Sequence, residues 1–447
     1  MFTLNDILQG NEGAVHLHGP SSPDPEQVFP SAQHDSRQVG RGDLFVAIKG
    51  KHVDAHSFIP AVAQAGAGAA LCTELSSEAP PEFLQIVVPD VVQALHATAR
   101  VRTQRQQNTT LIGITGSNGK TSTKEAVASV LSRKAPTLKT YASYNSELGY
   151  PLTLLRLEPE HRYAVLEMGA QSIGELAFLC NTIASPNWAI VTNVGAAHLE
   201  YFGSQERVAI AKSELVEALP SDGIAILNYD DSNVRNMSEK TQARVLYYGR
   251  GEGAEVCGSD IGGDMLQGRH FTLSYQGQQV HVQLRLPGEH GVSIALAAAA
   301  AGCAAEMSLE NICLALDNRQ SIIAITTAMQ GTHLVEGGKR WAVLGDIFEL
   351  GRYARSEHRL SGEALAGVVD YLVAIGDEAR YYVEGAIRSR MSANNIYYFD
   401  ADVENGPELE AAKQAAVDLL KKEVKSGDLV LLKGSRGMHM ETMLDMV

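Results

Sequence analysis

Residues 113–121 read Gly113-Ile114-Thr115-Gly116-Ser117-Asn118-Gly119-Lys120-Thr121, after an apolar run that begins at Leu111 and before a helical stretch that extends to about Arg133. A strand, a glycine turn and a helix in this order predict a phosphate-binding loop, because glycines let backbone N–H groups approach phosphate oxygens and the helix N-terminus attracts anions. The spacing is shorter than the pattern G-x-x-x-x-G-K-[ST], since Ile114 stands where that pattern has a glycine. The candidate nucleotide ligands of this loop are Gly116, Ser117, Asn118, Gly119, Lys120 and Thr121.

Apolar strands alternate with helices after this loop, at residues 164–166, 188–191 and 224–227. This pattern predicts a parallel sheet with helices on both faces. Ligands of such a sheet bind beyond the carboxyl ends of its strands, where Glu167 follows one strand and His198 follows another. We therefore expect Glu167 and His198 at the edge that carries Lys120, with Glu167 and the Thr121 hydroxyl as Mg²⁺ ligands.

A length of 447 residues is typical of about three domains. Residues 1–108 alternate short strands and small helices and predict a small α/β domain, which a polar linker at residues 102–110 separates from a central domain at 109–312. Alternating polar and apolar residues at about 256–286 predict antiparallel strands, and the alanine-rich stretch 292–305 predicts a buried helix. Residues 313–447 repeat apolar strands that end in glycine turns, which predicts a second, doubly wound α/β domain.

Composition excludes several classes of partner. A net charge of −15 argues against broad attraction to nucleic acid or anionic lipid. The longest apolar stretch is too short for a membrane span and no secretory signal is visible, so we expect a cytoplasmic protein. Five scattered cysteines without a C-x-x-C pair predict neither a disulfide framework nor a zinc site, and we expect all five to be buried thiols.

Taken in order, these motifs resemble those of the Mur ligases, the ATP-dependent amide-forming enzymes of peptidoglycan precursor synthesis, and most closely those of the MurF branch. The resemblance covers essentially the whole chain. Besides the loop and Thr123-Lys124-Glu125, it rests on residues 144–152, 167–170, 192–198, 211–214, 343–351 and 433–436. It implies an α/β protein of three domains: an amino-terminal UDP-sugar domain, a central P-loop ATPase domain with a parallel sheet, and a carboxyl-terminal Rossmann-like domain on the side of ATP and D-alanyl-D-alanine.

The resemblance implies ATP-dependent ligation of D-alanyl-D-alanine to UDP-N-acetylmuramoyl-tripeptide through an acyl phosphate, by a cytoplasmic monomer. By matching position, Lys120, His198 and Lys212 would be catalytic, and Thr121, Glu167 and His198 would hold Mg²⁺. Lys212 matches the lysine that the family carboxylates; without the resemblance it would be read as an exposed helix lysine. The nucleotide would also meet Asn318 and Asp346. The residues implied for the other substrates are Ser36, Arg37, Asp54, His56, Asn145, Lys433, Ser435 and Arg436.

Two departures from the family pattern keep other functions open. Ile294 stands where the family usually has Asn, and the stretch Asp-Asp-x-Tyr-Asn-x-Asn-Pro, which carries the hinge into the third domain, is reduced to Asp317-Asn318-Arg319-Gln320-Ser321. One alternative is a diverged paralogue that binds UDP-sugar or nucleotide but ligates poorly or not at all. Another is a MurE-type ligase that adds a single amino acid; the absence of an Asp-Asn-Pro-Arg motif and the presence of residues 433–436 argue against it.

Overall fold

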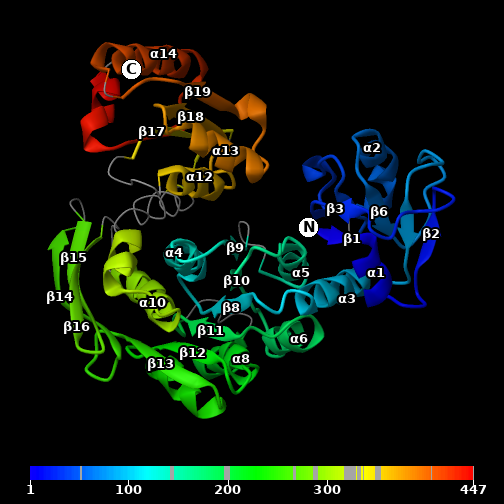
Figure 1. The fold of residues 1–447 in the computed structure, drawn as a ribbon, viewed down its shortest axis with the longest axis horizontal. Helices are drawn as coiled ribbons and strands as arrows, with labels where there is room; N and C mark the ends of the chain where they lie inside the picture. The colour runs from blue at the N-terminus through cyan, green and yellow to red at the C-terminus, as the bar shows by residue number, and fades with distance from the viewer. Residues whose placement is uncertain are drawn as a thin grey trace. The chain divides into compact units, whose positions relative to one another are not determined.

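The computed structural model describes residues 1–50, 53–140, 145–195, 202–264, 268–284, 290–316, 329, 334–335, 337–347, 354–403 and 405–445. The chain divides into two compact units. The first consists of Met1–Gly263, Arg269–Gln283 and Gly288–Leu316, and the second of Asp264–Gly268, Leu284–Pro287 and Asp317–Val447. Both are built from sheets with helices packed on them (Figure 1).

The amino-terminal part of the first unit is a five-stranded sheet in the order β2-β7-β6-β5-β4. Its strands are parallel except for β2, which is antiparallel to β7. The strands are β2 (His16–His18), β4 (Ala32–Gln33), β5 (Leu44–Val46), β6 (Ala69–Cys72) and β7 (Gln85–Val87), with a small antiparallel pair of β1 (Phe2–Thr3) and β3 (Val28–Phe29). With helices α1 (Leu4–Gly10), α2 (Ile59–Gln64) and α3 (Val91–Gln104), this confirms the expected small α/β sheet.

Helix α3 corrects the prediction of a polar linker at residues 102–110, because residues 102–104 belong to its last turn. Arg102 is 9% exposed, and its Nη2 donates a hydrogen bond to the carbonyl oxygen of Leu157 at 2.5 Å. The helix packs against α1, α5 (Gly149–Leu154) and α6 (Glu175–Thr182). The polar side chain of Arg102 thus makes a buried hydrogen bond, and α3 joins the two parts of this unit by direct packing.

The central sheet has nine strands in the order β16-β15-β14-β13-β12-β11-β8-β10-β9. The strands from β8 to β13 run parallel, as predicted. They are β8 (Thr110–Thr115), β9 (Thr137–Lys139), β10 (Tyr163–Glu167), β11 (Trp188–Val191), β12 (Ile224–Asn228) and β13 (Arg244–Gly249). Figure 1 shows α4 (Lys120–Ser132) and α5 on one face of this sheet and α6 and α8 (Gln205–Glu217) on the other, which explains why its strands are apolar on both sides.

The predicted antiparallel region and buried helix are also present. Strands β14 (Val256–Asp264), β15 (Gly268–Tyr275) and β16 (Gln278–Leu284) extend the sheet. Gln276 and Gly277 join β15 to β16 with φ angles of 49° and 75°, the positive values that a two-residue hairpin turn requires. Helix α10 (His290–Ala304) packs on α4, β12 and β13, and its residues 295–301 are at most 1% exposed because their small side chains allow close approach.

The second unit contains a parallel four-stranded sheet in the order β19-β18-β17-β20. Alternate residues of β17 (Arg340–Gly345) face different cores: Trp341 and Val343 pack with helix α14 (Gly406–Glu423), whereas Ala342 and Leu344 pack with residues of α12 (Ala354–Leu365) and α13 (Arg380–Arg388). The other strands are β18 (Tyr371–Ile375), β19 (Ile396–Phe399) and β20 (Leu429–Lys433). The prediction of a second doubly wound domain is confirmed.

The cysteine prediction is only partly correct. All five thiols are free, and Cys72, Cys180 and Cys303 are buried, but Cys257 and Cys313 are only partly buried. No helix in the described part of the chain is long and apolar enough to cross a membrane.

Candidate active site

The phosphate loop lies between β8, which ends at Thr115, and α4, which begins at Lys120. Gly116 has a φ of 146°, and a Cβ atom there would lie 2.0 Å from Thr192 Oγ1. Gly119 has a φ of 78°, but no atom of the described residues would lie within 4 Å of its Cβ. Both positions therefore require glycine, Gly116 for packing and conformation and Gly119 for conformation alone. The open side of Gly119, at the N-terminus of α4, can admit a phosphate.

A second loop, residues 192–195 after β11, holds the phosphate loop in place. Thr192 Oγ1 donates to the carbonyl of Asn118 at 2.8 Å, and the Asn118 amide donates to Asn193 Oδ1 at 3.0 Å. The Gly195 amide donates to Ser117 Oγ at 2.9 Å. This segment is part of the motif at residues 192–198, but the sequence alone does not reveal a role for Thr192 or Asn193. The pairing of β11 with β8 is the tertiary fact that brings the two loops together.

Lys120 folds back over the loop that precedes it. Its Nζ donates to the carbonyl oxygens of Gly116 and Ser117 at 2.8 and 3.2 Å. Burial lowers the pKa of Lys120, while the nearby Glu167 carboxylate acts in the opposite direction. Thr121, next in the first turn of α4, is partly buried. The Lys120 ammonium therefore lies on the carbonyl oxygens of the loop, and Thr121 is the next residue in the first turn of α4.

Glu167 ends β10, next to β8, and is only 2% exposed. Asn145 Nδ2 donates to Glu167 Oε1 at 2.9 Å, and Lys124 Nζ lies 3.8 Å from Oε2. Oε2 is buried and accepts no hydrogen bond from any described residue. A buried carboxylate oxygen with unused lone pairs suits a hard divalent cation. The described residues contain no group of three His, Cys, Asp or Glu that could hold a metal, so a cation at Glu167 would draw further oxygen ligands from hydroxyl, water or phosphate.

Lys212 on α8 is 2% exposed, so the interpretation of this residue as an exposed helix lysine is wrong. Its Nζ donates to the carbonyl of Ala170 at 3.2 Å, in the loop that follows Glu167. Burial and the charge of Lys120 lower the pKa of Lys212 to about 8, against the opposing effect of Glu175 and Glu214. The structure thereby places this amine near the edge that carries Lys120.

The amino-terminal candidates form two short turns. Arg37, whose side chain is 86% exposed, pairs with Asp35 at 2.7 Å in a turn that includes Ser36. His56 donates from Nδ1 to Asp54 Oδ1 at 2.6 Å, and its Nε2 accepts from the amide of Thr73 at 3.0 Å. That hydrogen bond lowers the pKa of Asp54. Both ring nitrogens of His56 are therefore engaged within the protein, and the imidazole orders the turn around Asp54.

In the second unit, Asp346 follows β17 and is 1% exposed. The Glu378 amide donates to its Oδ2 at 3.2 Å, and a Cβ at Gly376 would lie 2.5 Å from the carboxylate. The carbonyl oxygen of Asp346 accepts from the Ser435 amide at 2.9 Å. Burial raises the pKa of Asp346 to about 7. Direct contact between this carboxylate and a nucleotide would require the surrounding loops to move apart.

Lys433, Ser435 and Arg436 lie at the carboxyl end of β20, which pairs with β17. They therefore share one edge of this sheet with Asp346. Two further candidates, His198 and Asn318, fall outside the described residues.

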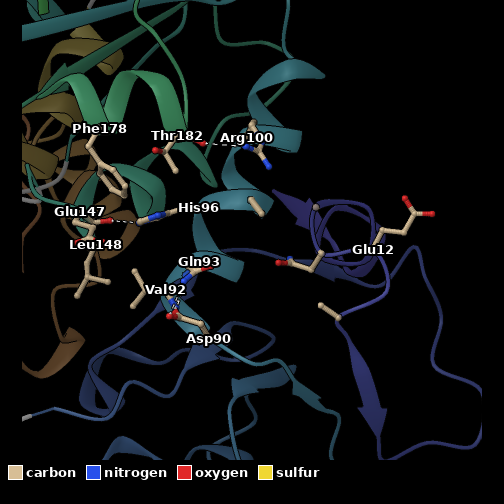
Figure 2. Close-up of a pocket in the computed structure, with 14 residues that line it drawn as sticks. Glu12, Asp90, Val92, Gln93, His96, Arg100, Glu147, Leu148, Phe178 and Thr182 are labelled. Carbon is tan, nitrogen blue, oxygen red and sulfur yellow. Dashed lines mark hydrogen bonds between the residues drawn. The ribbon is translucent and has the colours of Figure 1, made fainter. Parts of the chain in front are cut away.

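A cavity of about 900 Å³ in the first unit was not anticipated from the sequence. It lies where the end of α1 and helix α3 meet the segments around Glu147 and Phe178, and Figure 2 shows its lining. His96 Nε2 donates to the carbonyl of Glu147 at 2.9 Å, and Arg100 Nη1 donates to the carbonyl of Thr182 at 3.4 Å (Figure 2). None of the candidate site residues lines this cavity, but His96 binds the backbone at Glu147, two residues after Asn145.

Comparison with known families agrees with this architecture. Residues 31–103 match the "Mur ligase family, catalytic domain", residues 114–302 the "Mur ligase middle domain", and residues 317–436 the "Mur ligase, glutamate ligase domain".

Individual relatives match over nearly the full chain. A Mycobacterium tuberculosis protein named UDP-N-acetylmuramoyl-tripeptide–D-alanyl-D-alanine ligase is 31% identical over 99% of this chain and 97% of its own. The crystal structure of MurF from Acinetobacter baumannii is 30% identical, with a TM-score of 0.63 over 99% of this chain and 98% of that one. MurF from Thermotoga maritima, solved in complex with ADP, is 26% identical, with a TM-score of 0.55 over 93% and 96% of the two chains. The chain belongs to the Mur ligase family and, within it, to the MurF branch.

Proposed function

We propose that this protein is an ATP-dependent ligase that joins D-alanyl-D-alanine to UDP-N-acetylmuramoyl-tripeptide. The observation that carries the proposal is the meeting of the phosphate loop, Lys120, Glu167 and Lys212 around one edge of a parallel sheet. The names of full-length relatives supply the substrates.

The proposed reaction has two steps. The terminal carboxylate of the tripeptide attacks the γ-phosphorus of ATP, which forms an acyl phosphate and breaks the bond to ADP. The amine of D-alanyl-D-alanine then attacks the acyl carbon; the new amide bond forms as phosphate leaves and the amine loses a proton. The protein contributes by positioning and by stabilising negative charge.

Charge on the transferring phosphoryl group is met by Lys120 and by the N-terminus of α4 beside Gly119. Thr121 and Glu167 are the described residues that would hold Mg²⁺, with His198 as the third residue of the proposed set. Mg²⁺, when bound, would neutralise charge on the phosphate oxygens. Asn145 acts on the substrate side and orients Glu167 through the hydrogen bond to Oε1.

Lys212 is proposed to carry a carboxyl group on its amine. A neutral amine reacts with CO₂ to form a carbamate with loss of a proton, which turns a cation into an anionic oxygen ligand. The lowering of the pKa of Lys212 from 10.5 to about 8 leaves a much larger neutral fraction of the amine near neutral pH than an ordinary lysine has, and burial limits access of water. Both features support the assignment.

The work is divided among three domains in this proposal. Residues 1–108 hold the UDP-sugar through Ser36, Arg37, Asp54 and His56, and residues 109–312 hold ATP and the metal. Residues 313–447 meet the dipeptide through Lys433, Ser435 and Arg436, and Asn318 and Asp346 lie on the nucleotide side. The protein is proposed to act as a cytoplasmic monomer.

The test is phosphate release by the purified protein with ATP, Mg²⁺, UDP-N-acetylmuramoyl-tripeptide and D-alanyl-D-alanine. We expect turnover only when both substrates are present. UDP-substrate binding without dipeptide-dependent turnover would instead indicate a paralogue that does not ligate. Turnover with a single amino acid in place of the dipeptide would indicate a MurE-type specificity.

A further inference from the structure

A row of alternating charges extends from strand β9 to Glu167 at the candidate metal edge. Lys139 Nζ lies 2.5 Å from Glu125 Oε2, Lys124 Nζ lies 3.2 Å from Glu125 Oε1, and the same Lys124 Nζ lies 3.8 Å from Glu167 Oε2. The side chains of Lys124 and Glu167 are 1% and 2% exposed, and those of Glu125 and Lys139 are 15% and 17% exposed. Two cations and two anions are thus paired largely out of contact with water.

Glu125 is the centre of this row because each of its oxygens contacts a different lysine. Burial alone would raise its pKa, but Lys139 and Lys124 together lower the pKa of Glu125 to about 2. The carboxylate is therefore ionised throughout the physiological range. A buried ion is stable only when its counter-ions are close, so Glu125 and Lys124 hold each other in place.

Lys124 is shared unequally between its two carboxylates. Its Nζ is within hydrogen-bonding reach of Glu125 Oε1 but lies outside that reach from Glu167 Oε2. Oε2 is the oxygen that accepts no hydrogen bond from the described residues. Lys120, one helical turn earlier on α4, is engaged by carbonyl oxygens of the phosphate loop.

We propose that Lys124 and Glu125 are positioning residues for the metal edge, in which Glu125 draws the Lys124 ammonium away from Glu167 and keeps Glu167 Oε2 available to a divalent cation. The inference rests on the proposed function, since it assumes that Glu167 is a metal ligand. Lys124 and Glu125, which the sequence offers only as part of the motif Thr123-Lys124-Glu125, thereby gain a role at this edge. The Lys124 ammonium offsets part of the negative charge of Glu167. Glu125 limits that effect by holding the ammonium at a distance from Glu167.

If Lys124 and Glu125 have this role, substituting them should change divalent-cation affinity in opposite directions. Glu125→Gln removes the competing carboxylate, so the Lys124 ammonium moves toward Glu167 and divalent-cation affinity falls, on the order of tenfold. Lys124→Met removes the competing cation, so affinity rises severalfold or more. The double variant removes both charges and should return affinity close to the wild-type value. A pair that only stabilises the fold would weaken binding in every variant.

The experiment measures Mn²⁺ binding by electron paramagnetic resonance to the full-length protein, with Mg²⁺ as competitor, and needs no turnover. Lys240→Met and Glu217→Gln are matched controls, because Lys240 and Glu217 form a pair at 2.8 Å that is 41% and 45% exposed. Thermal unfolding identifies any variant that does not fold; if Lys124→Met is such a variant, Glu125→Gln and the double variant still test opposite expectations.

Weaker binding in Glu125→Gln with recovery in the double variant supports the inference. Equal Mn²⁺ affinities of the wild type and all three variants would overturn the inference. So would a double variant that binds Mn²⁺ more weakly than Glu125→Gln does. The proposed function fails separately, if wild-type protein neither binds Mn²⁺ nor turns over.

Discussion

Glu167 and Asp346 occupy equivalent places in two parallel sheets, yet their surroundings differ. Each lies at the carboxyl end of an inner strand, and they are 2% and 1% exposed. Glu167 has the Lys124 ammonium 3.8 Å away. Asp346 meets a backbone amide and the ring of His358, whose Nε2 lies 3.9 Å away. The same position in a fold can therefore serve a charged site in one domain and hold loops together in another.

The ring of His358 is engaged by the backbone around it. Its Nδ1 donates to the carbonyl of Ala354 at 2.8 Å, and its Nε2 accepts from the amide of Ile347 at 3.0 Å. Burial and the nearby carboxylates of Glu378 and Asp377 raise the pKa of Asp346 to about 7, against the backbone hydrogen bonds that it accepts. Glu125, with a lysine on each oxygen, has a pKa of about 2. The presence of close cations, more than burial itself, sets the direction of the shift.

The largest effect is expected from Lys120→Ala in the central domain. Loss of the ammonium at the phosphate loop should lower kcat by roughly 10³-fold, measured as phosphate release. Calorimetric binding of the UDP-linked tripeptide should stay near the wild-type value, because the proposed sugar site lies on the amino-terminal sheet. Lys240→Ala, on the surface, is the control. Equal loss of turnover and UDP-substrate binding would contradict the division of labour between the domains.

Neutral isosteres at the two strand ends test the comparison directly. Glu167→Gln should lower kcat by roughly 10²-fold even at saturating Mg²⁺, because a neutral amide is a poorer ligand for the cation that would neutralise charge on the reacting phosphates. Asp346→Asn should lower kcat by less than about tenfold, because a buried carboxyl with a pKa of about 7 is already partly neutral. Steady-state phosphate release with both substrates varied measures the two. If Asp346→Asn were the more damaging change, Asp346 would be a reacting group.

The smallest expected effect is the pH dependence of the thermal stability of Asp346→Asn. The pKa of Asp346 is higher in the folded protein than its ordinary value of 3.8, so the folded state binds this proton more tightly. That stabilisation is complete below about pH 4 and is lost as the pH rises to about 7. Asp346→Asn has no such titration, so its thermal midpoint relative to wild type should rise between pH 4 and pH 7 and then stay level.

A control in the same domain should show the opposite slope. The Lys425 amide donates to Asp428 and lowers its pKa, although burial acts in the other direction. Asp428 therefore stabilises the fold above its ordinary pKa, and the thermal midpoint of Asp428→Asn relative to wild type should fall as the pH rises through the acidic range. Scanning calorimetry measures both variants at several pH values between about 2.5 and 8, so that the range extends below the ordinary pKa of 3.8 for Asp428. If the relative thermal midpoints of the two variants changed with pH in the same direction, Asp346 and Asp428 would not have pKa values shifted in opposite directions.

Local sequence was sufficient for most of the fold. The strands β8, β10, β11 and β12 and the loop between β8 and α4 lie where apolar runs and glycines predict them. Such patterns are local, because strand length, turn chemistry and helix start depend on residues a few positions apart. The prediction of a linker at residues 102–110 was wrong for its first residues, because a polar composition does not reveal that Arg102 hydrogen-bonds to the distant Leu157.

By itself, the sequence determined the phosphate loop, the order of the sheets and the family motifs. Only the tertiary structure decided that Lys212 is buried, that Asp346 is covered, that Asn193 holds Asn118 and that Lys124 is shared by two carboxylates. These facts join residues far apart in the chain, and they depend on which strands are neighbours. The sequence does not show which counter-ion a charged residue meets or how deeply that residue is buried, because both depend on which strands pair. The protonation state and role of a buried side chain are set by the partners that this pairing brings within a few ångströms.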